Sequence, residues 1–245
     1  MKFRAAFAVL PLLFVTACGS GGSGGNTSAP VAAVKPPAGT NWLETVVKTP
    51  EGGYRMGNPN APIKLVEYGS RTCPVCGLFG REGTQPLEQN YVATGKVSWE
   101  FREFLVHGQP DFAPALLGRC GGPAPFFALL EQMYINQGPV EEKMGSAEGQ
   151  ALFARMQTAK PLDVAKAWGD YLGYVDFVKS RGIPEDKARA CLNDQAAFDE
   201  IVKVMDDASK NKGVGGTPTF FLNGDIVPNV ADWKGLEAAL KARGA

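Results

Sequence analysis

Residues 63–76 read IKLVEYGSRTCPVC, and this stretch decides the fold of the chain. The apolar run at residues 63–68 predicts a buried strand, and the segment that begins at Pro74 predicts a helix. Proline is favoured at the first position of a helix, where its missing N–H costs no hydrogen bond. Cys73 and Cys76 therefore stand at a strand-to-helix junction, with a spacing that lets them close into a disulfide and open again.

Cys73 is predicted to be the reactive thiol of this pair. It lies where the helix begins, and the unpaired backbone N–H groups there carry partial positive charge. Such a site stabilises a thiolate and lowers the pKa of the cysteine. Cys76, one turn later and more buried, is predicted to be the resolving thiol. Exchange with the cysteines of other proteins then passes through a mixed disulfide.

A zinc site is the alternative for two cysteines at this spacing. A four-cysteine zinc site normally shows a second close pair, whereas Cys120 and Cys191 are far apart in the sequence. The single histidine, His107, excludes a multi-histidine site and is expected to be a polar loop residue. We therefore predict no metal and no cofactor.

A second informative stretch, at residues 213–224, reads GVGGTPTFFLNG. Its glycines break the preceding helical pattern, and Thr217-Pro218 then leads into a short apolar strand at residues 219–222. Asn223-Gly224 predicts a two-residue hairpin turn, because such turns favour residues that tolerate positive φ.

The remaining chain alternates strands with a long helical block. Residues 42–56, with a Gly52-Gly53 turn, predict a first strand that is either hairpin-like or extended, and residues 97–106 predict a second core strand. Pro86 is expected to kink or interrupt the helix that follows Cys73. Further helices are predicted at residues 126–134, 145–158, 162–180, 185–192, 198–210 and 233–242. A strand-helix-strand start and a strand-strand-helix end, separated by helices, resemble a thioredoxin architecture with a helical insertion.

Residues 42–245 resemble the DsbA family of thiol:disulfide oxidoreductases. The resemblance rests on KLVEY at residues 64–68, CPVC at 73–76, the helical insertion, GGTPTFFLNG at 215–224 and the last helix. It implies an α/β chain with a thioredoxin fold and an inserted helical domain. The thioredoxin-like domain would comprise residues 41–108 and 190–245, and the insertion residues 109–189.

The resemblance also assigns roles to residues outside the cysteine pair. Pro218 matches the family's cis-proline, and the backbone of Thr217 would pair with an extended substrate peptide. Glu67 matches the buried acid beneath the active site, which could accept or return the proton of Cys76. The alternative for Glu67 is an exposed or salt-bridged residue at the strand end.

Two departures from the family leave the direction of exchange open. The best-known oxidases carry a histidine between the cysteines, where this chain has Val75, which supplies no charge to the thiolate. Thr217 occurs before the proline both in isomerases and in some oxidases. We expect a disulfide donor, and two alternatives remain: a reductase or isomerase kept reduced by a membrane electron donor, and a non-catalytic lipoprotein that uses the fold for binding.

Five cysteines are present, and Cys18 is assigned to the N-terminal processing site, which leaves four. In an exported protein, an even number of remaining cysteines suggests that they form two disulfide pairs. Cys120 and Cys191 would then form a structural disulfide. The alternative is that they are separate buried thiols.

Residues 1–18 are expected to be a lipoprotein signal peptide. Lys2 and Arg4 precede a short apolar run, and Val15-Thr16-Ala17-Cys18 resembles the site at which bacterial lipoproteins are cleaved and lipidated on the cysteine. An ordinary secretory signal is the alternative. Residues 19–40 are rich in Gly, Ser, Ala and Pro and are expected to form a flexible linker. These features predict a lipid-anchored protein on the periplasmic side of a bacterial membrane.

The expected partners follow from this location and from the charge balance. The chain has 25 basic and 25 acidic residues and no basic stripe, which argues against nucleic-acid binding. The resemblance implies cysteine-containing exported polypeptides as substrates, and a membrane redox partner that is either a DsbB-like oxidase or an electron donor. We expect the protein to be a monomer.

Overall fold

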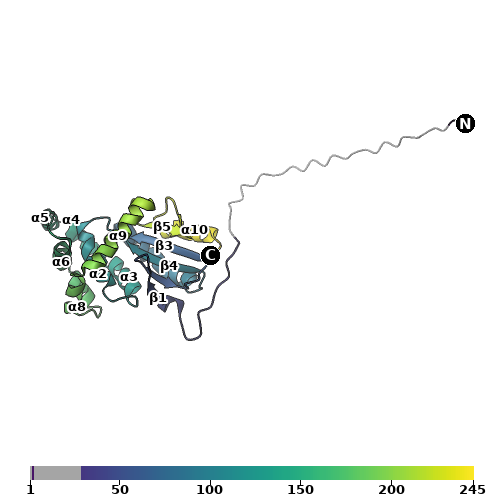
Figure 1. Ribbon diagram of the computed structural model, residues 1–245, viewed down its shortest axis with the longest axis horizontal. Helices are drawn as coiled ribbons and strands as arrows, with labels where there is room; N and C mark the ends of the chain where they lie inside the picture. Colours follow the sequence, from purple (N-terminus) through teal and green to yellow (C-terminus); the bar gives the residue numbers. More distant parts are fainter. Residues whose placement is uncertain (1, 3–28) are drawn as a thin grey trace.

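A six-stranded mixed sheet lies at the centre of the part of the chain that the structure describes. This computed structural model describes residue 2 and residues 29–245. The strands lie in the order β1-β2-β4-β3-β5-β6 (Figure 1). Their bounds are β1 Val46–Lys48, β2 Tyr54–Gly57, β3 Ile63–Gly69, β4 Val97–Glu103, β5 Thr219–Leu222 and β6 Asp225–Ile226. β3 and β4 run parallel, and the other neighbouring pairs are antiparallel.

The two central strands have core packing on both faces of the sheet. Successive side chains of a strand point to opposite faces, so Leu65 of β3 joins one hydrophobic core and Tyr68 joins another. β4 is buried at every position. It ends at Glu103, earlier than the sequence predicts, because β3 ends at Gly69, whose carbonyl accepts the N–H of Phe104.

Helices α1 (Pro74–Leu87), α3 (Phe126–Ile135) and α10 (Trp233–Ala242) cover the face to which Leu65 points. Their apolar side chains meet those of the central strands in one core. Trp99 of β4 packs on Phe127 of α3 with ring centroids 4.6 Å apart, within the favourable range for aromatic pairs. The opposite face carries α9 (Gln195–Asn211), which contributes Val204 and Ala208 to the core around Tyr68.

Two expected hairpins are confirmed. β1 and β2 pair in antiparallel register across a turn in which Gly52 has a φ of 84°. β5 and β6 pair across Asn223 and Gly224, whose φ values are 54° and 92°. Two consecutive positive φ values are what a tight hairpin turn requires, and Asn followed by Gly tolerates them best.

Pro86 changes the winding of the helix that begins at Pro74. α1 ends at Leu87, and the chain continues without a break into a π-helical segment at Glu88–Val92. Proline has no N–H to bond to the carbonyl of the residue four positions earlier. The interruption predicted at Pro86 therefore takes the form of a wider turn.

A block of helices between β4 and β5 encloses a second core, which includes Leu116, Trp168 and Leu192. α3 joins the two cores, because Leu130 belongs to the first and Met133 to the second. The other helices before α9 are α2 Gln109–Arg119, α4 Gln137–Gly145, α5 Ala147–Arg155, α6 Pro161–Leu172, α7 Tyr174–Lys179 and α8 Glu185–Cys191.

The sequence patterns miss α2 and α4, and they merge α6 and α7 into one helix. Pro110 and Pro114 hide α2: one lies in the first turn, where proline is tolerated, and the other removes a single hydrogen bond. The predicted helix at residues 145–158 is instead α5, which begins after Ser146, whose side chain caps the N–H of Gly149. The predicted helix at residues 162–180 is broken at Gly173, whose φ is 82°.

Part of the stretch expected to be a flexible linker lies against the body of the protein. The N–H of Val31 donates to Gly244 O over 2.8 Å, and that of Val34 donates to Thr94 O over 2.9 Å. The indole N–H of Trp42 donates to Val34 O. This segment passes beside the C-terminus (Figure 1), at the end of the sheet where β4 begins.

The expected signal peptide and its lipidation site Cys18 lie outside the described residues, apart from Lys2. Within residues 29–245, no helix has both the length and the apolar character needed to cross a membrane.

Candidate active site

Cys73 and Cys76 lie at the carboxyl end of β3, where the chain turns into α1. Cys73 occupies the position just before the helix, and Pro74 opens it. Both thiols are free, so the structure represents the reduced dithiol. Cys73 is 6% exposed and Cys76 is fully buried. A partner sulfur can therefore reach Cys73 first.

The surroundings separate the proton affinities of the two thiols. The pKa of Cys73 is lowered to about 5, mainly by the hydrogen bond from Cys76, with help from Thr217 and from the backbone N–H groups of Val75 and Cys76. Burial opposes this shift but does not cancel it. Burial raises the pKa of Cys76 well above its ordinary range, and the charge on Cys73 adds to the effect. At neutral pH Cys73 is a thiolate and Cys76 keeps its proton.

The loop before β5 brings Thr217 and Pro218 to the dithiol. The peptide bond between them is cis. Cys73 Sγ lies 3.4 Å from the carbonyl oxygen of Thr217, to which the thiol can donate. The two residues are 144 positions apart in the sequence, and they meet because β5 pairs directly with β3.

Glu67 is fully buried in β3, the strand that leads to the dithiol, and it is electrostatically coupled to Cys73. The indole N–H of Trp99 donates to its Oε2 over 3.0 Å, whereas Oε1 has no hydrogen-bond partner among the residues that the structure describes. Burial raises the pKa of Glu67 to about 8, and the charges of Cys73 and Glu103 act in the same direction. Glu67 therefore carries a proton at neutral pH. The alternative of an exposed or salt-bridged glutamate is wrong.

Gln137, at the start of α4, is a residue of this site that the sequence patterns miss. Its side chain is fully buried, and Nε2 donates to the carbonyl oxygens of Cys73, over 2.8 Å, and of Arg71, over 3.2 Å. Gly77 makes room for it, because a Cβ at Gly77 would lie 1.8 Å from Gln137 Oε1. No local motif marks Gln137, since it is 64 residues away from Cys73.

Arg71 and Glu103 form a buried ion pair under the same loop, and the sequence patterns miss this pair as well. Arg71 Nη2 lies 2.8 Å from Glu103 Oε1, and the guanidinium stacks on the ring of Phe126, 4.9 Å from its centroid. Gly118 of α2 admits the guanidinium, because a Cβ there would lie 2.2 Å from Arg71 Cζ. The pair connects the active-site loop with β4 and with the helical block.

Asp111 organises a polar cluster beside Cys73. It is 2% exposed and accepts hydrogen bonds from the hydroxyls of Ser70 and Thr72, the first over 3.2 Å, and from the backbone N–H of His107 over 2.8 Å. His107 Nδ1 lies 2.8 Å from Thr72 Oγ1. The expectation that His107 is a polar loop residue is correct, but its attachment to the residue before Cys73 appears only in the structure.

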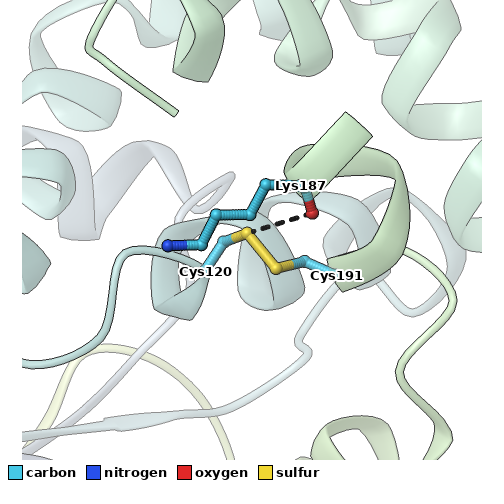
Figure 2. Close-up of a disulfide and its surroundings, with 3 residues drawn as sticks. All are labelled: Cys120, Lys187 and Cys191. Atoms are coloured by element: carbon cyan, nitrogen blue, oxygen red, sulfur yellow. Dashed lines mark hydrogen bonds between the residues drawn. A yellow bond between two sulfur atoms is a disulfide. The ribbon is translucent and has the colours of Figure 1, made fainter. Parts of the chain in front are cut away.

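Cys120 and Cys191 form a disulfide that ties the end of α2 to the end of α8 (Figure 2). Their Cα atoms are 5.7 Å apart across a sequence separation of 71. The carbonyl oxygen of Lys187 lies 3.5 Å from Cys120 Sγ. This is a contact and not a hydrogen bond, because an oxidised sulfur has no proton to donate. The bond excludes the four-cysteine zinc alternative, since these two sulfurs are already joined.

In residue 2 and residues 29–245, no group of three or more His, Cys, Asp or Glu side chains is placed to hold a metal ion.

Fold and site together define a class of protein. The sheet, the dithiol at the start of α1 and the cis-proline before β5 are the arrangement of thioredoxin-fold proteins, here with a helical block inserted between β4 and β5. The thioredoxin family model matches residues 49–242, and the chain belongs to that family.

Comparisons with individual proteins agree with this assignment. A Rickettsia bellii protein whose provisional name is protein-disulfide oxidoreductase is 26% identical over 74% of this chain and 61% of its own length. The crystal structure of a protein-disulfide isomerase from Novosphingobium aromaticivorans has a TM-score of 0.72 and 28% identity, and the match covers 76% of this chain and 94% of that one. Wolbachia pipientis alpha-DsbA1 has a TM-score of 0.60 and 20% identity, covering 81% and 94%.

These similarities establish a DsbA-like thioredoxin fold. The chain spans about three fifths of the length of the Rickettsia bellii relative that it matches.

Proposed function

We propose that this protein is a thiol:disulfide oxidoreductase that exchanges disulfides with cysteine-containing exported polypeptides through Cys73 and Cys76. One observation carries the proposal: the reachable thiol has a pKa lowered to about 5, while its buried partner stays protonated. A stabilised thiolate is both a nucleophile and a good leaving group, which is what disulfide exchange requires.

As a disulfide donor, the oxidised protein reacts in two steps. A substrate thiolate attacks Cys73 Sγ, the bond between Cys73 and Cys76 breaks, and Cys76 leaves as a thiolate that takes up a proton. A second substrate thiolate then attacks the substrate sulfur of the mixed disulfide, and Cys73 leaves as a thiolate. The substrate gains a disulfide, and the protein gains the two electrons.

Glu67 is proposed to carry the proton for Cys76. Its carboxyl group is neutral at neutral pH and fully buried, and its ionisation would raise the pKa of Cys76, so the two groups are electrostatically coupled. A carboxyl group whose pKa lies near the working pH can give or accept a proton in either direction. This role fits the Oε1 atom, which has no hydrogen-bond partner within residues 29–245.

Substrate is proposed to bind along the Thr217 and Pro218 backbone, beside Cys73. The Thr217 carbonyl already faces the reactive sulfur. Around the dithiol, Val75 and Leu78 expose 45% and 46% of their surface. Apolar side chains at the entrance suit an unfolded polypeptide better than a small polar molecule.

The proposed direction is oxidation of substrates, with reoxidation by a DsbB-like membrane partner. A low pKa of Cys73 stabilises the reduced protein and so makes its disulfide more oxidising. The second candidate is a reductase or isomerase kept reduced by a membrane electron donor, which the name of the Novosphingobium structure favours. The redox state of Cys73 and Cys76 in cells separates them, because a mostly reduced pair is incompatible with a disulfide donor.

Lipid on Cys18 is proposed to hold the protein on the periplasmic side of the membrane. The support is the pattern of a short apolar run that ends in Val15-Thr16-Ala17-Cys18. Metabolic labelling with a fatty acid should mark the wild-type chain, and label retained in Cys18→Ser would refute the proposal.

Trapping with a model dithiol peptide tests the exchange itself. Cys76→Ser, mixed with the disulfide form of the peptide, should accumulate a mixed disulfide, because the Cys73 thiolate attacks the peptide disulfide and the resolving thiol is gone. Cys73→Ser should accumulate none. The purified wild-type protein, oxidised beforehand, should oxidise the peptide. If the peptide is not oxidised and no mixed disulfide is trapped, the proposal fails and the chain is a non-catalytic binding protein.

A further inference from the structure

The hydrogen bonds around Thr72 determine which nitrogen of His107 carries a proton. The Thr72 hydroxyl has one proton, and the carboxylate of Asp111 can only accept, so that proton goes to Asp111 Oδ1. Thr72 Oγ1 must then accept from His107 Nδ1, 2.8 Å away. Nδ1 is therefore protonated, and the titrating nitrogen is Nε2, on a side chain that is 37% exposed.

This arrangement connects the imidazole to the residue that directly precedes the reactive cysteine. Thr72 directly precedes Cys73 in the chain, so His107 is one hydrogen bond away from the residue adjacent to the reactive sulfur. The charged groups that face His107 are Asp111 of α2, Cys73 at the start of α1 and Glu141 of α4, and each raises the pKa of His107. Asp111 is the largest cause, with Oδ1 3.8 Å from His107 Nδ1, and burial opposes the shift.

Building on the exchange function proposed above, we propose that His107 is the electrostatic partner of the Cys73 thiolate, with Thr72 and Asp111 as its positioning residues. The motif position between the cysteines holds Val75, which carries no charge. The imidazolium of His107 supplies a positive charge from the loop after β4 instead.

Linkage makes this proposal testable without turnover. If the imidazolium stabilises the thiolate, the thiolate stabilises the imidazolium by the same free energy. The thiolate exists in the reduced protein and is absent from the disulfide. The pKa of His107 should therefore be higher in the reduced protein than in the oxidised one, by about 0.5, which is the order expected for a pair of charges screened by solvent near the surface.

Proton NMR titration of the full chain, prepared without a histidine tag, measures this difference directly. The chain has one histidine, so the imidazole resonance needs no assignment. We expect the higher pKa in the reduced protein, and a reduced Cys73→Ser variant that titrates like the oxidised wild type. Equal pKa values in the reduced and oxidised wild type would overturn the proposal.

Two control variants exclude other causes of a redox-dependent shift. Glu141→Gln removes another charge near His107 and should lower its pKa equally in both redox states, leaving the difference intact. His107→Gln should raise the pKa of Cys73, measured by thiolate absorbance, whereas Glu141→Gln should change it far less. If Glu141→Gln abolishes the redox difference, Glu141 and not Cys73 is its source, and the proposal fails.

The titration is independent of the exchange assay, so the two proposals fail separately. A protein that oxidises no peptide can still show the redox-linked pKa, and an active one can lack it.

Discussion

The side-chain amide of Gln137 donates a hydrogen bond to the carbonyl oxygen of Cys73 over 2.8 Å. This bond connects the first residue of α4, in the helical block, with the reactive cysteine of the sheet domain. A fully buried amide at this point also holds the Arg71 carbonyl, so the loop that carries Cys73 is fixed from the helical side. The helical block is thus part of the construction of the active site.

Gly77→Ala should destabilise the protein, because the added Cβ would lie 1.8 Å from Gln137 Oε1. Overpacking of this kind costs about 1–3 kcal/mol. Urea unfolding measures the loss. Gly138→Ala is the matched control, since a Cβ at Gly138 would lie within 4 Å of no other atom in the described part of the chain. If the two variants are equally stable, the fit of Gln137 against α1 is not as tight as the structure describes.

Glu67→Gln should stabilise the oxidised protein increasingly as the pH rises from 5 to 8. The pKa of Glu67 is raised to about 8 in the folded protein from an ordinary value of 4.5. Between these values the folded state holds a proton that the unfolded state releases, so wild-type stability falls as pH rises. The loss is on the order of a few kcal/mol and is absent in the glutamine variant.

Urea unfolding at pH 5 and pH 8 measures this effect on the disulfide form, in which Cys73 does not titrate. Glu88→Gln serves for comparison, because the pKa of Glu88 is also raised, to about 7, at a less buried position away from the dithiol. A pH dependence that is the same in the wild type and in Glu67→Gln would show that Glu67 is already ionised in the fold.

Alkylation of the reduced protein should depend on pH with a midpoint at about 5, because the thiolate of Cys73 is the reacting species. One label per chain is expected, at Cys73, since Cys76 is fully buried and holds its proton. The rate with iodoacetamide, followed by peptide mapping, checks both statements. Labelling of Cys76 in the folded Cys73→Ser variant at neutral pH would contradict the burial of that thiol.

Replacing Cys120 and Cys191 by serine should cost about 4 kcal/mol in the free energy of unfolding, because their disulfide closes a sequence separation of 71. The pKa of Cys73 should stay unchanged, since none of its causes involves this bond. Urea unfolding and thiolate absorbance provide the two readouts. A shift of the Cys73 pKa would mean that the disulfide also shapes the dithiol site.

Local patterns predicted much of the fold, and they failed where tertiary packing overrides them. The apolar run before Cys73 and the turn at Asn223-Gly224 contain their own signals, because buried strands and positive φ values select residue types directly. α2 escaped prediction because its prolines oppose a helix locally, while burial of Leu116 and Leu117 in the second core stabilises it.

The sequence by itself determined the reactive pair, since thiol spacing and the start of a helix are properties of adjacent residues. The tertiary structure alone decided what surrounds that pair. Gln137 and His107 reach the loop at Cys73 from distant parts of the chain. Gln137 donates to backbone carbonyls of that loop, and His107 bonds to the Thr72 hydroxyl beside it. These contacts do not exist until β3, α2 and α4 have come together.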